Sequence, residues 1–117
     1  MKREIKFRVW DKKYKRFIYN DPHISLDLRG NVYNLQNGEG GEAYELSQST
    51  GLKDKKGRLC YENDIVQWYD KYDYSTPHDV VSLLVGTYGT DFLKFLLYTD
   101  FEIIGNIYEN PELLSHA

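Results

Sequence analysis

The sequence has a single cysteine and no long hydrophobic run, and both shortages exclude classes of protein. One cysteine, Cys60, rules out a disulfide within the chain, which is usual for proteins of a reducing compartment. The apolar stretches are far shorter than the roughly 20 residues that span a bilayer. Met1 to Lys6 do not lead into the apolar core of a signal peptide. We therefore expect a cytoplasmic protein that has no membrane partner.

Catalytic motifs are lacking as well. The chain has no P-loop, no Gly-x-Ser-x-Gly and no His-Glu-x-x-His, and its histidines are scattered. Oxygen and imidazole ligands do occur close together at Asp70, Asp73, His78 and Asp79. Their spacing matches no defined metal motif. We predict that the protein is not an enzyme and holds no cofactor and no metal.

Two other positions with reactive side chains have structural interpretations. Cys60 lies in an apolar stretch without a histidine nearby in the sequence, so a packed thiol is favoured over a nucleophile. Glu62 and Asp64 could form a carboxylate pair for acid–base chemistry. In a tight corner, however, such side chains more often accept hydrogen bonds from backbone N–H groups, and we favour that role.

Aromatic residues are the excess of this chain: 11 Tyr, 5 Phe and 2 Trp make up 15% of its 117 residues. Such rings are enriched in strands, and a chain of this length suits one compact domain. Residues 5–10 alternate between apolar and charged positions, which predicts a half-buried strand with Trp10 on the charged face. Residues 17–19 would complete a hairpin. We predict a mainly β fold.

Turn signals divide the remaining sequence into short segments. The further strands that we expect cover residues 24–28, 32–35, 65–69, 80–85, 92–98 and 101–107. The first two of these, with Gly30 and Asn31 between them, would form a second hairpin. For residues 93–97 a helix is the open alternative. Glycine-rich residues 37–42 predict a flexible linker, and residues 70–79 lack periodicity, which is typical of an exposed loop.

The C-terminal end carries two local signals. Gly105 interrupts the last expected strand, which predicts a bulge or a close approach of another part of the backbone. Asn110 followed by Pro111 and Glu112 predicts a short terminal helix, with Asn110 as its N-cap.

Turn residues are densest between Thr50 and Trp68. The Asp54 side chain can accept backbone N–H bonds while Gly57 takes the left-handed conformation that closes a turn. Asn63 tolerates a positive φ better than other non-glycine residues, so Asn63 and Asp64 suit a second corner. We interpret Asp54, Gly57, Asn63 and Asp64 as structural turn residues rather than as a site.

Three ordered blocks of this sequence resemble the YopX family. They are REIKFRVWD at 3–11, TGLKDKKG at 50–57 with YENDIV at 61–66, and IGNIYENPELL at 104–114. The resemblance implies a protein encoded by phages or prophages of mostly Gram-positive bacteria, with an unassigned biochemical function. It also implies an N-terminal β-hairpin subdomain at residues 1–49 and an SH3-like β-barrel with a short C-terminal helix at residues 50–117, together one compact domain. The family usually has glycine where this chain has Asn63.

Charge is distributed unevenly along the chain. Residues 1–19 hold eight Lys/Arg and two Asp/Glu, a net of +6, and the remainder carries the balance of the overall −3, a net of −9. A cationic hairpin with interleaved rings is typical of single-strand binders. Its candidate contacts are Lys6, Arg8, Lys12, Lys13, Lys15 and Arg16. The acidic remainder argues against a broad phosphate-binding face.

The same hairpin offers aromatic side chains for partner binding: Trp10, Tyr14 and Tyr19. We expect Trp10 to be covered by the second subdomain or by another chain. The leading hypothesis is a non-enzymatic interaction module that binds a host or phage protein in the bacterial host and forms a homo-oligomer. The alternative is a phage regulator that binds nucleic acid through the basic hairpin.

Overall fold

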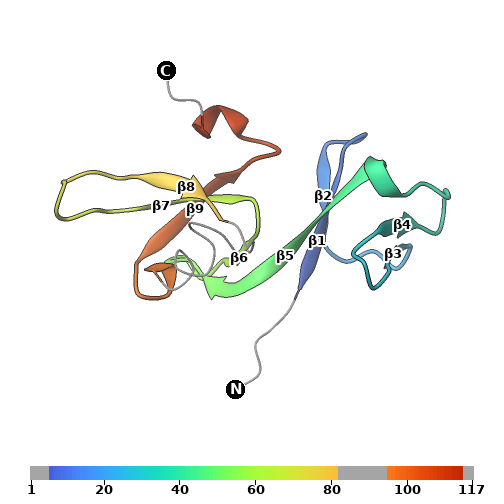
Figure 1. Cartoon of the computed structure of the whole chain (residues 1–117), viewed down its shortest axis with the longest axis horizontal. Coiled ribbons are helices and arrows are strands. Elements are labelled where there is room, and N and C mark those ends of the chain that lie inside the picture. Colours follow the sequence, from blue (N-terminus) through green and yellow to red (C-terminus); the bar gives the residue numbers. More distant parts are fainter. Residues whose placement is uncertain (1–5, 82–94, 115–117) are drawn as a thin grey trace. The chain divides into compact units, whose positions relative to one another are not determined.

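The computed structural model describes residues 6–81 and 95–114, which fold mainly as short antiparallel strands and so confirm the mainly β prediction (Figure 1). The strands are β1 (Phe7–Asp11), β2 (Arg16–Ile18), β3 (Ile24–Leu26), β4 (Val32–Asn34), β5 (Tyr44–Lys53), β6 (Leu59–Tyr61), β7 (Asp64–Trp68), β8 (His78–Val80) and β9 (Phe101–Asn106), and the 3₁₀ segments are η1 (Gly41–Ala43) and η2 (Pro111–Leu114). The chain forms two compact units, Lys6–Gln48 and one that begins at Ser49. We call them the N-terminal and C-terminal units.

In the N-terminal unit, β1 lies between β2 and the first half of β5, and both pairings are antiparallel. The predicted hairpins β1–β2 and β3–β4 are confirmed, the second with Gly30 in its turn at a φ of 84°. Val9, Val32 and Tyr44 form the buried core of this unit. A strand with one apolar face packs in this way when a second hairpin covers that face.

The opposite face of β1 is buried too, so the prediction of a half-buried strand was wrong. Arg8 and Trp10 are only 4% and 8% exposed. The Trp10 ring meets Phe17 of β2 edge to face, with centroids 4.9 Å apart, and the Arg8 guanidinium lies 4.2 Å from the same ring centroid. Phe17 of the same hairpin therefore packs against Trp10 in a cross-strand aromatic pair.

In the C-terminal unit, β7 is the central strand and pairs antiparallel with β8 and with β9. The core of this unit consists of five buried side chains: Cys60, Val66, Val81, Leu96 and Phe101. Cys60 is fully buried, as a packed thiol would be. The core gathers side chains from segments far apart in the sequence.

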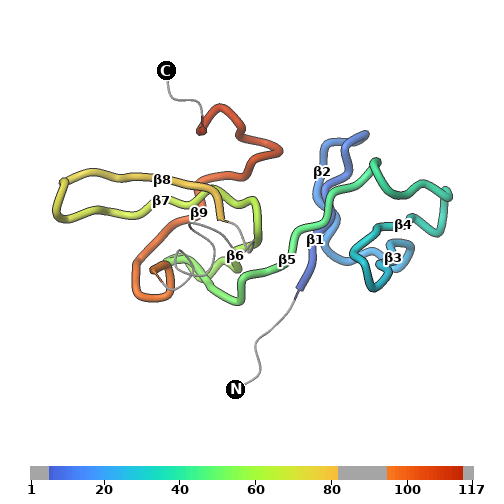
Figure 2. Tube along the Cα trace, in the orientation of Figure 1, coloured from blue at the N-terminus to red at the C-terminus, as the bar shows by residue number. Residues whose placement is uncertain are grey.

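Residues 71–76, in the segment expected to be an exposed loop, are exposed as predicted, but the segment at residues 70–79 also forms part of a hairpin. β8 begins at His78, and the ladder continues outward to a bridge at which Asp70 and Ser75 exchange backbone hydrogen bonds of 2.8 and 3.2 Å. Figure 2 shows this long β7–β8 excursion of the chain. Side-chain periodicity could not predict it, because the ladder rests on backbone pairing at positions that bury no apolar face.

Of residues 92–98, only 95–98 lie within the described part of the chain, and residues 95–97 are helical, so the helix left open for residues 93–97 is the correct alternative there and the strand is not. Leu96 is 1% exposed, whereas Phe95 and Leu97 on either side of it are 44% and 58% exposed. The Thr99 hydroxyl donates to the Phe95 carbonyl oxygen across this turn (2.7 Å). Of the strand expected at residues 80–85, only residues 80 and 81 lie within the described part of the chain.

Of the two explanations predicted for Gly105, the bulge is confirmed, whereas the close neighbour is the Asn110 side chain and not another part of the backbone. The register of β9 against β7 shifts between Ile65 and Val66, opposite Gly105, so a bulge is present. A Cβ on Gly105 would lie 2.5 Å from Asn110 Oδ1.

The predicted terminal helix is present as η2, but the Asn110 side chain does not act as its N-cap among the described residues. Its Oδ1 accepts instead from Asn106 N (3.3 Å).

Asn63 closes the corner between β6 and β7 with a φ of 70°. Its backbone N–H donates to Val81 O (2.8 Å), and its backbone oxygen accepts from Ile107 N (3.0 Å). Its side-chain amide donates to the Tyr108 hydroxyl oxygen (3.0 Å). One residue in the left-handed region thus connects the strands on both sides of β7.

Replacing Asn63 with alanine is expected to destabilise the fold more than replacing it with glycine. Both variants lose the bond to Tyr108, but only alanine retains a Cβ in the left-handed region, which costs about 1–2 kcal/mol, partly offset by the greater flexibility of unfolded glycine. The free energy of unfolding, measured by urea titration, should differ by about 0.5–1 kcal/mol. Equal stability of the two variants would contradict a strained corner.

Candidate functional site

The turn after β5 is organised around the carboxylate of Asp54, which is buried. Oδ1 accepts hydrogen bonds from the backbone N–H groups of Lys56 (3.0 Å) and Arg58 (2.9 Å), and Gly57 closes the turn at a φ of 80°. Oδ2 accepts from Arg58 Nε (3.0 Å) and from Ile103 N of β9 (3.1 Å). Both oxygens are therefore occupied by the fold.

This turn also covers the outer edge of β9. Lys55 N donates to Phe101 O (2.9 Å), and the Arg58 guanidinium donates to Ile103 O (2.7 Å). A free strand edge invites pairing with another chain. Here side chains and a turn satisfy the outward-facing groups of Phe101 and Ile103, so this edge of the sheet is closed.

The Asp64 carboxylate has a comparable structural position. It is 3% exposed, and its Oδ2 accepts from Tyr61 N (2.8 Å) across the corner. A carboxylate held by backbone N–H groups stabilises the corner and is poorly placed to exchange protons with a substrate. The corner therefore offers no pair of free carboxylates.

The basic hairpin loop is ordered by Asp11. Its Oδ1 accepts from Lys13 N (3.0 Å) and Tyr14 N (3.2 Å), and Lys15 adopts a positive φ of 53°. The Lys13 ammonium and the Arg16 guanidinium lie 5.5 and 5.6 Å from the centroid of the exposed Tyr14 ring. The loop thus presents two cations on one exposed ring.

Of the residues proposed to contact phosphates, the structure leaves all but Arg8 exposed. Lys6, Lys13, Lys15 and Arg16 are exposed. Lys12 is exposed as well, but its Nζ lies 3.3 Å from Glu45 Oε1 on β5. Arg8, in contrast, is buried against Phe17 and cannot reach a phosphate on the surface.

The aromatic candidates of this hairpin divide in the same way. Trp10 is buried by Phe17 and is not a surface for partners. Tyr14 and Tyr19 are 63% and 59% exposed. The Tyr19 ring is packed on one side by Phe17, with centroids 5.9 Å apart.

A second group of exposed rings lies at the outer end of the β7–β8 hairpin. Tyr69, Tyr72 and Tyr74, which we call the tyrosine surface, are 59%, 84% and 83% exposed. Asp70 Oδ1 orders their turn by accepting from Tyr72 N (2.9 Å) and Asp73 N (3.2 Å). The turn therefore holds large amphipathic rings in water, where their area is available to a partner.

Beside the tyrosine surface lies a pocket of about 260 Å³, which we call the hairpin pocket. The residues that line it are four aromatic ones and three polar or charged ones: Trp68, Tyr69, Tyr72, Phe95, Asp70, Lys71 and Thr99. Trp68 and Phe95 meet edge to face with centroids 5.4 Å apart and ring planes at 72°. Aromatic walls beside a carboxylate can hold an apolar or a cationic group.

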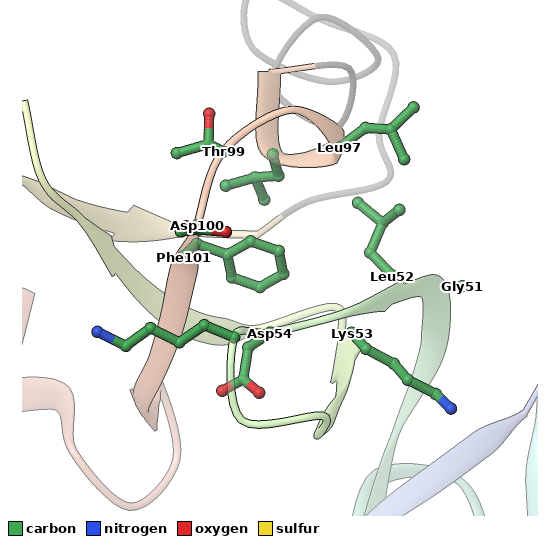
Figure 3. Close-up of a pocket in the computed structure, with 10 residues that line it drawn as sticks. Gly51, Leu52, Lys53, Asp54, Leu97, Thr99, Asp100 and Phe101 are labelled. Carbon is green, nitrogen blue, oxygen red and sulfur yellow. The ribbon is translucent and has the colours of Figure 1, made fainter.

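Figure 3 shows a larger and more open pocket of about 420 Å³ between β5 and β9. The Phe101 ring and the Leu52 side chain point toward one another across it, with Leu97 above. Phe101 belongs to the buried core, so the floor of this pocket is the outer surface of that core. Of the two acidic residues that line this pocket, Asp54 and Asp100, the carboxylate of Asp54 is already bound by the turn.

Within residues 6–81 and 95–114 no group of three His, Cys, Asp or Glu side chains could hold a metal ion. The residues considered for a metal site have other contacts: Asp70 orders its turn, and His78 Nε2 contacts the Leu113 carbonyl oxygen. No helix among the described residues is long and apolar enough to span a membrane.

Mainly antiparallel units of this kind, with small cores and exposed rings at hairpin ends, define a class of small β proteins. The chain belongs to the YopX family, because the family model described as YopX protein matches residues 6–115. The sequence resemblance is thereby confirmed. No curated protein matches the sequence.

Two solved structures are similar over nearly the whole chain. Protein EF1440 from Enterococcus faecalis is 27% identical, with a TM-score of 0.62 over 96% of this chain and 99% of that one. Protein yopX from Bacillus subtilis is 22% identical, with a TM-score of 0.61 over 94% of this chain and 98% of that one, and shares the fold. The SH3-like barrel stays a prediction.

The tyrosine surface was missed from the sequence. Its signal was the spacing of Tyr69, Tyr72 and Tyr74 among the acids of a segment without periodicity. Large rings in such a segment have no strand face to pack on, and they remain exposed unless a partner covers them. The sequence placed the candidate binding residues on the basic hairpin instead, because that segment has a high net positive charge.

Proposed function

We propose that this chain is a non-enzymatic accessory protein, encoded by a phage or prophage, that binds a host or phage protein in the bacterial cytoplasm through its tyrosine surface. The observation that carries this proposal is the exposure of three tyrosines on one ordered turn beside the hairpin pocket. Tyrosine is enriched at the centres of protein interfaces because its ring buries much area at little entropic cost.

The enclosed carboxylates support the same proposal. The buried acids Asp54, in the turn after β5, and Asp64, in the corner between β6 and β7, are bound by backbone N–H groups, so neither is free for acid–base work. The turn around Asp54 also closes the β9 edge, so a partner would meet side chains rather than an open strand there.

Capture from host extract, with two matched triple variants, tests the proposal. Replacing Tyr69, Tyr72 and Tyr74 with serine should abolish retention of a partner that the unmodified chain retains. Replacing the exposed rings of Tyr14, Tyr19 and Tyr33 in the N-terminal unit should leave retention unchanged. The captured protein, once purified, must show saturable binding to the unmodified chain. The affinities of the two triple variants must follow the same order as their retention.

Two results would contradict the proposal. Retention lost only in the N-terminal variant would move the interface to the basic hairpin. Retention unaffected by either variant would exclude exposed tyrosine as the contact. Light scattering on the same three samples tests self-association, and a strictly monomeric chain would exclude the homo-oligomer.

Nucleic-acid binding is the second candidate, favoured by one observation. Lys13 and Arg16 hold their charges over the exposed Tyr14 ring, an arrangement that could serve phosphates and a stacked base together. Reversing the charges of Lys12, Lys13, Lys15 and Arg16 should then abolish a gel shift with single-stranded DNA or RNA at low salt. An absent shift at micromolar concentrations of the unmodified chain excludes this function.

A further inference from the structure

We infer that the hairpin pocket binds a lysine or arginine side chain from a basic segment of the partner protein, an inference that rests on the proposed function and names the chemistry of its partner. The pocket supplies the two elements that recognise such a group. Four of its lining residues are aromatic, and the acidic residue Asp70 lines it as well.

The rings favour a cation over a neutral apolar group. Trp68, Tyr72 and Phe95 line a pocket of about 260 Å³, and a cation over the face of such a ring gains about 0.5–2 kcal/mol according to its exposure. The chain already contains a contact of this kind here. Lys71 Nζ lies 5.6 Å from the Tyr72 ring centroid.

The charge at this end of the hairpin supports a basic partner. Between Tyr69 and Ser75, at the outer end of the hairpin, the chain carries Asp70 and Asp73 against Lys71, a net of −1. Asp70 uses Oδ1 for its turn, and among the described residues its Oδ2 accepts no hydrogen bond. A carboxylate oxygen beside an aromatic wall is the arrangement that pairs with an ammonium or a guanidinium group.

The same geometry gives Lys71 a competing role. Its ammonium occupies a face of Tyr72 and carries the charge that an incoming lysine or arginine would carry. Removing the charge of Lys71 should therefore strengthen binding, whereas removing that of Asp70 or the ring of Tyr72 should weaken it. Effects of opposite sign at neighbouring residues distinguish a binding site from general damage to the hairpin.

The test uses the whole chain and a fluorescein-labelled peptide of alternating glycine and arginine, followed by fluorescence anisotropy. A matched peptide with citrulline in place of arginine keeps the shape and removes the charge. We expect the arginine peptide to bind and the citrulline peptide to bind at least about tenfold more weakly, since each 1.4 kcal/mol is a factor of ten.

Three variants complete the test. Asp70→Asn retains an amide oxygen for the turn and removes the charge, and should weaken binding about fivefold. Tyr72→Leu should weaken it by a similar factor, and Lys71→Gln should strengthen it about two- to fivefold. Tyr14→Leu, on the basic hairpin, is the control that should leave binding unchanged.

The inference is overturned if the citrulline peptide binds as well as the arginine peptide, if an aspartate peptide binds better, or if no peptide binds at about 1 mM. It is also overturned if Lys71→Gln weakens binding. None of these results touches the proposed function, which fails only when capture of the partner does not depend on Tyr69, Tyr72 and Tyr74. If the captured partner depends on Tyr69, Tyr72 and Tyr74 but contains no basic segment, the proposed function stands and the inference about the hairpin pocket fails.

Discussion

Replacing Asp54 with alanine is expected to destabilise the C-terminal unit by about 4 kcal/mol, because four hydrogen bonds end on this one carboxylate and each contributes about 1 kcal/mol net. Two of them hold the turn, and the bond from Ile103 N attaches that turn to β9. The loss is a large fraction of the roughly 5–15 kcal/mol by which a domain is stable. Urea unfolding followed by tryptophan fluorescence measures it.

Asp27 provides the matched control for this prediction. It accepts from Arg29 N and Asn31 N (2.9 Å each), from the Asn31 amide (3.0 Å) and from the Tyr33 hydroxyl (3.4 Å), so its bonds are about as numerous. All of them are local and exposed. Asp27→Ala should therefore destabilise much less than Asp54→Ala, and an equal loss would show that the connection to β9 has no energetic role.

Acid pH should remove part of the Asp54 contribution. Burial by itself raises the pKa of this carboxyl, but the hydrogen bonds from Ile103, Arg58 and Lys56 outweigh it and hold the pKa below its ordinary value of 3.8. A group whose pKa is depressed in the folded state stabilises the fold above its unfolded pKa. That stability is lost as the pH falls through the folded pKa.

Asp54→Asn isolates this pH dependence, since the amide cannot titrate. The difference in unfolding free energy between the unmodified chain and Asp54→Asn should be largest at neutral pH and should shrink as the pH falls below about 4. A difference that is constant from neutral to acid pH would contradict a depressed pKa at Asp54.

The second large effect is expected at Gly105. Its alanine variant places a Cβ 2.5 Å from Asn110 Oδ1, 2.8 Å from Asn110 Cγ and 3.0 Å from Asn110 Cβ. Overpacking of this kind costs about 1–3 kcal/mol. The upper part of that range applies, because the Asn110 side chain is short and its Oδ1 is bound by Asn106 N. Thermal and urea unfolding of Gly105→Ala measure the loss.

A double-mutant cycle with Asn110→Gly tests the cause. Removing the Asn110 side chain should make room for the new methyl group, so Gly105→Ala should cost less in that background by about 1 kcal/mol or more, as expected of residues in contact. Additive losses would show that the bulge itself, rather than contact with Asn110, requires glycine at this position.

The corners of this protein followed from local sequence. Gly57 has a φ of 80°, Asn63 has a φ of 70°, and the carboxylates of Asp54 and Asp64 accept backbone N–H groups within four residues of themselves. Such conformations depend on the side chain at one position and on its immediate neighbours. The first two hairpins and the bulge at Gly105 were predictable for the same reason.

The candidate site was much less predictable, because burial is decided by residues far away in the sequence. Arg8 and Trp10 alternate with apolar residues as exposed side chains would, yet Phe17 covers both of them. Conversely, Tyr69, Tyr72 and Tyr74 have the composition of strand residues and remain in water at a hairpin end. Periodicity reports which side chains share a face and does not report whether that face is covered.

By itself, then, the sequence determined the strands with a clear alternation, the turn residues between them and the family. Only the tertiary structure decided the β7–β8 hairpin, the helical turn at residues 95–97 and the hairpin pocket that both of them line. The backbone hydrogen bonds of β8 do not depend on the pattern of its side chains. Leu96 is buried because it packs in a core formed by residues distant in the sequence. Local chemistry specifies where a chain turns, and long-range packing specifies which of its surfaces remain for a partner.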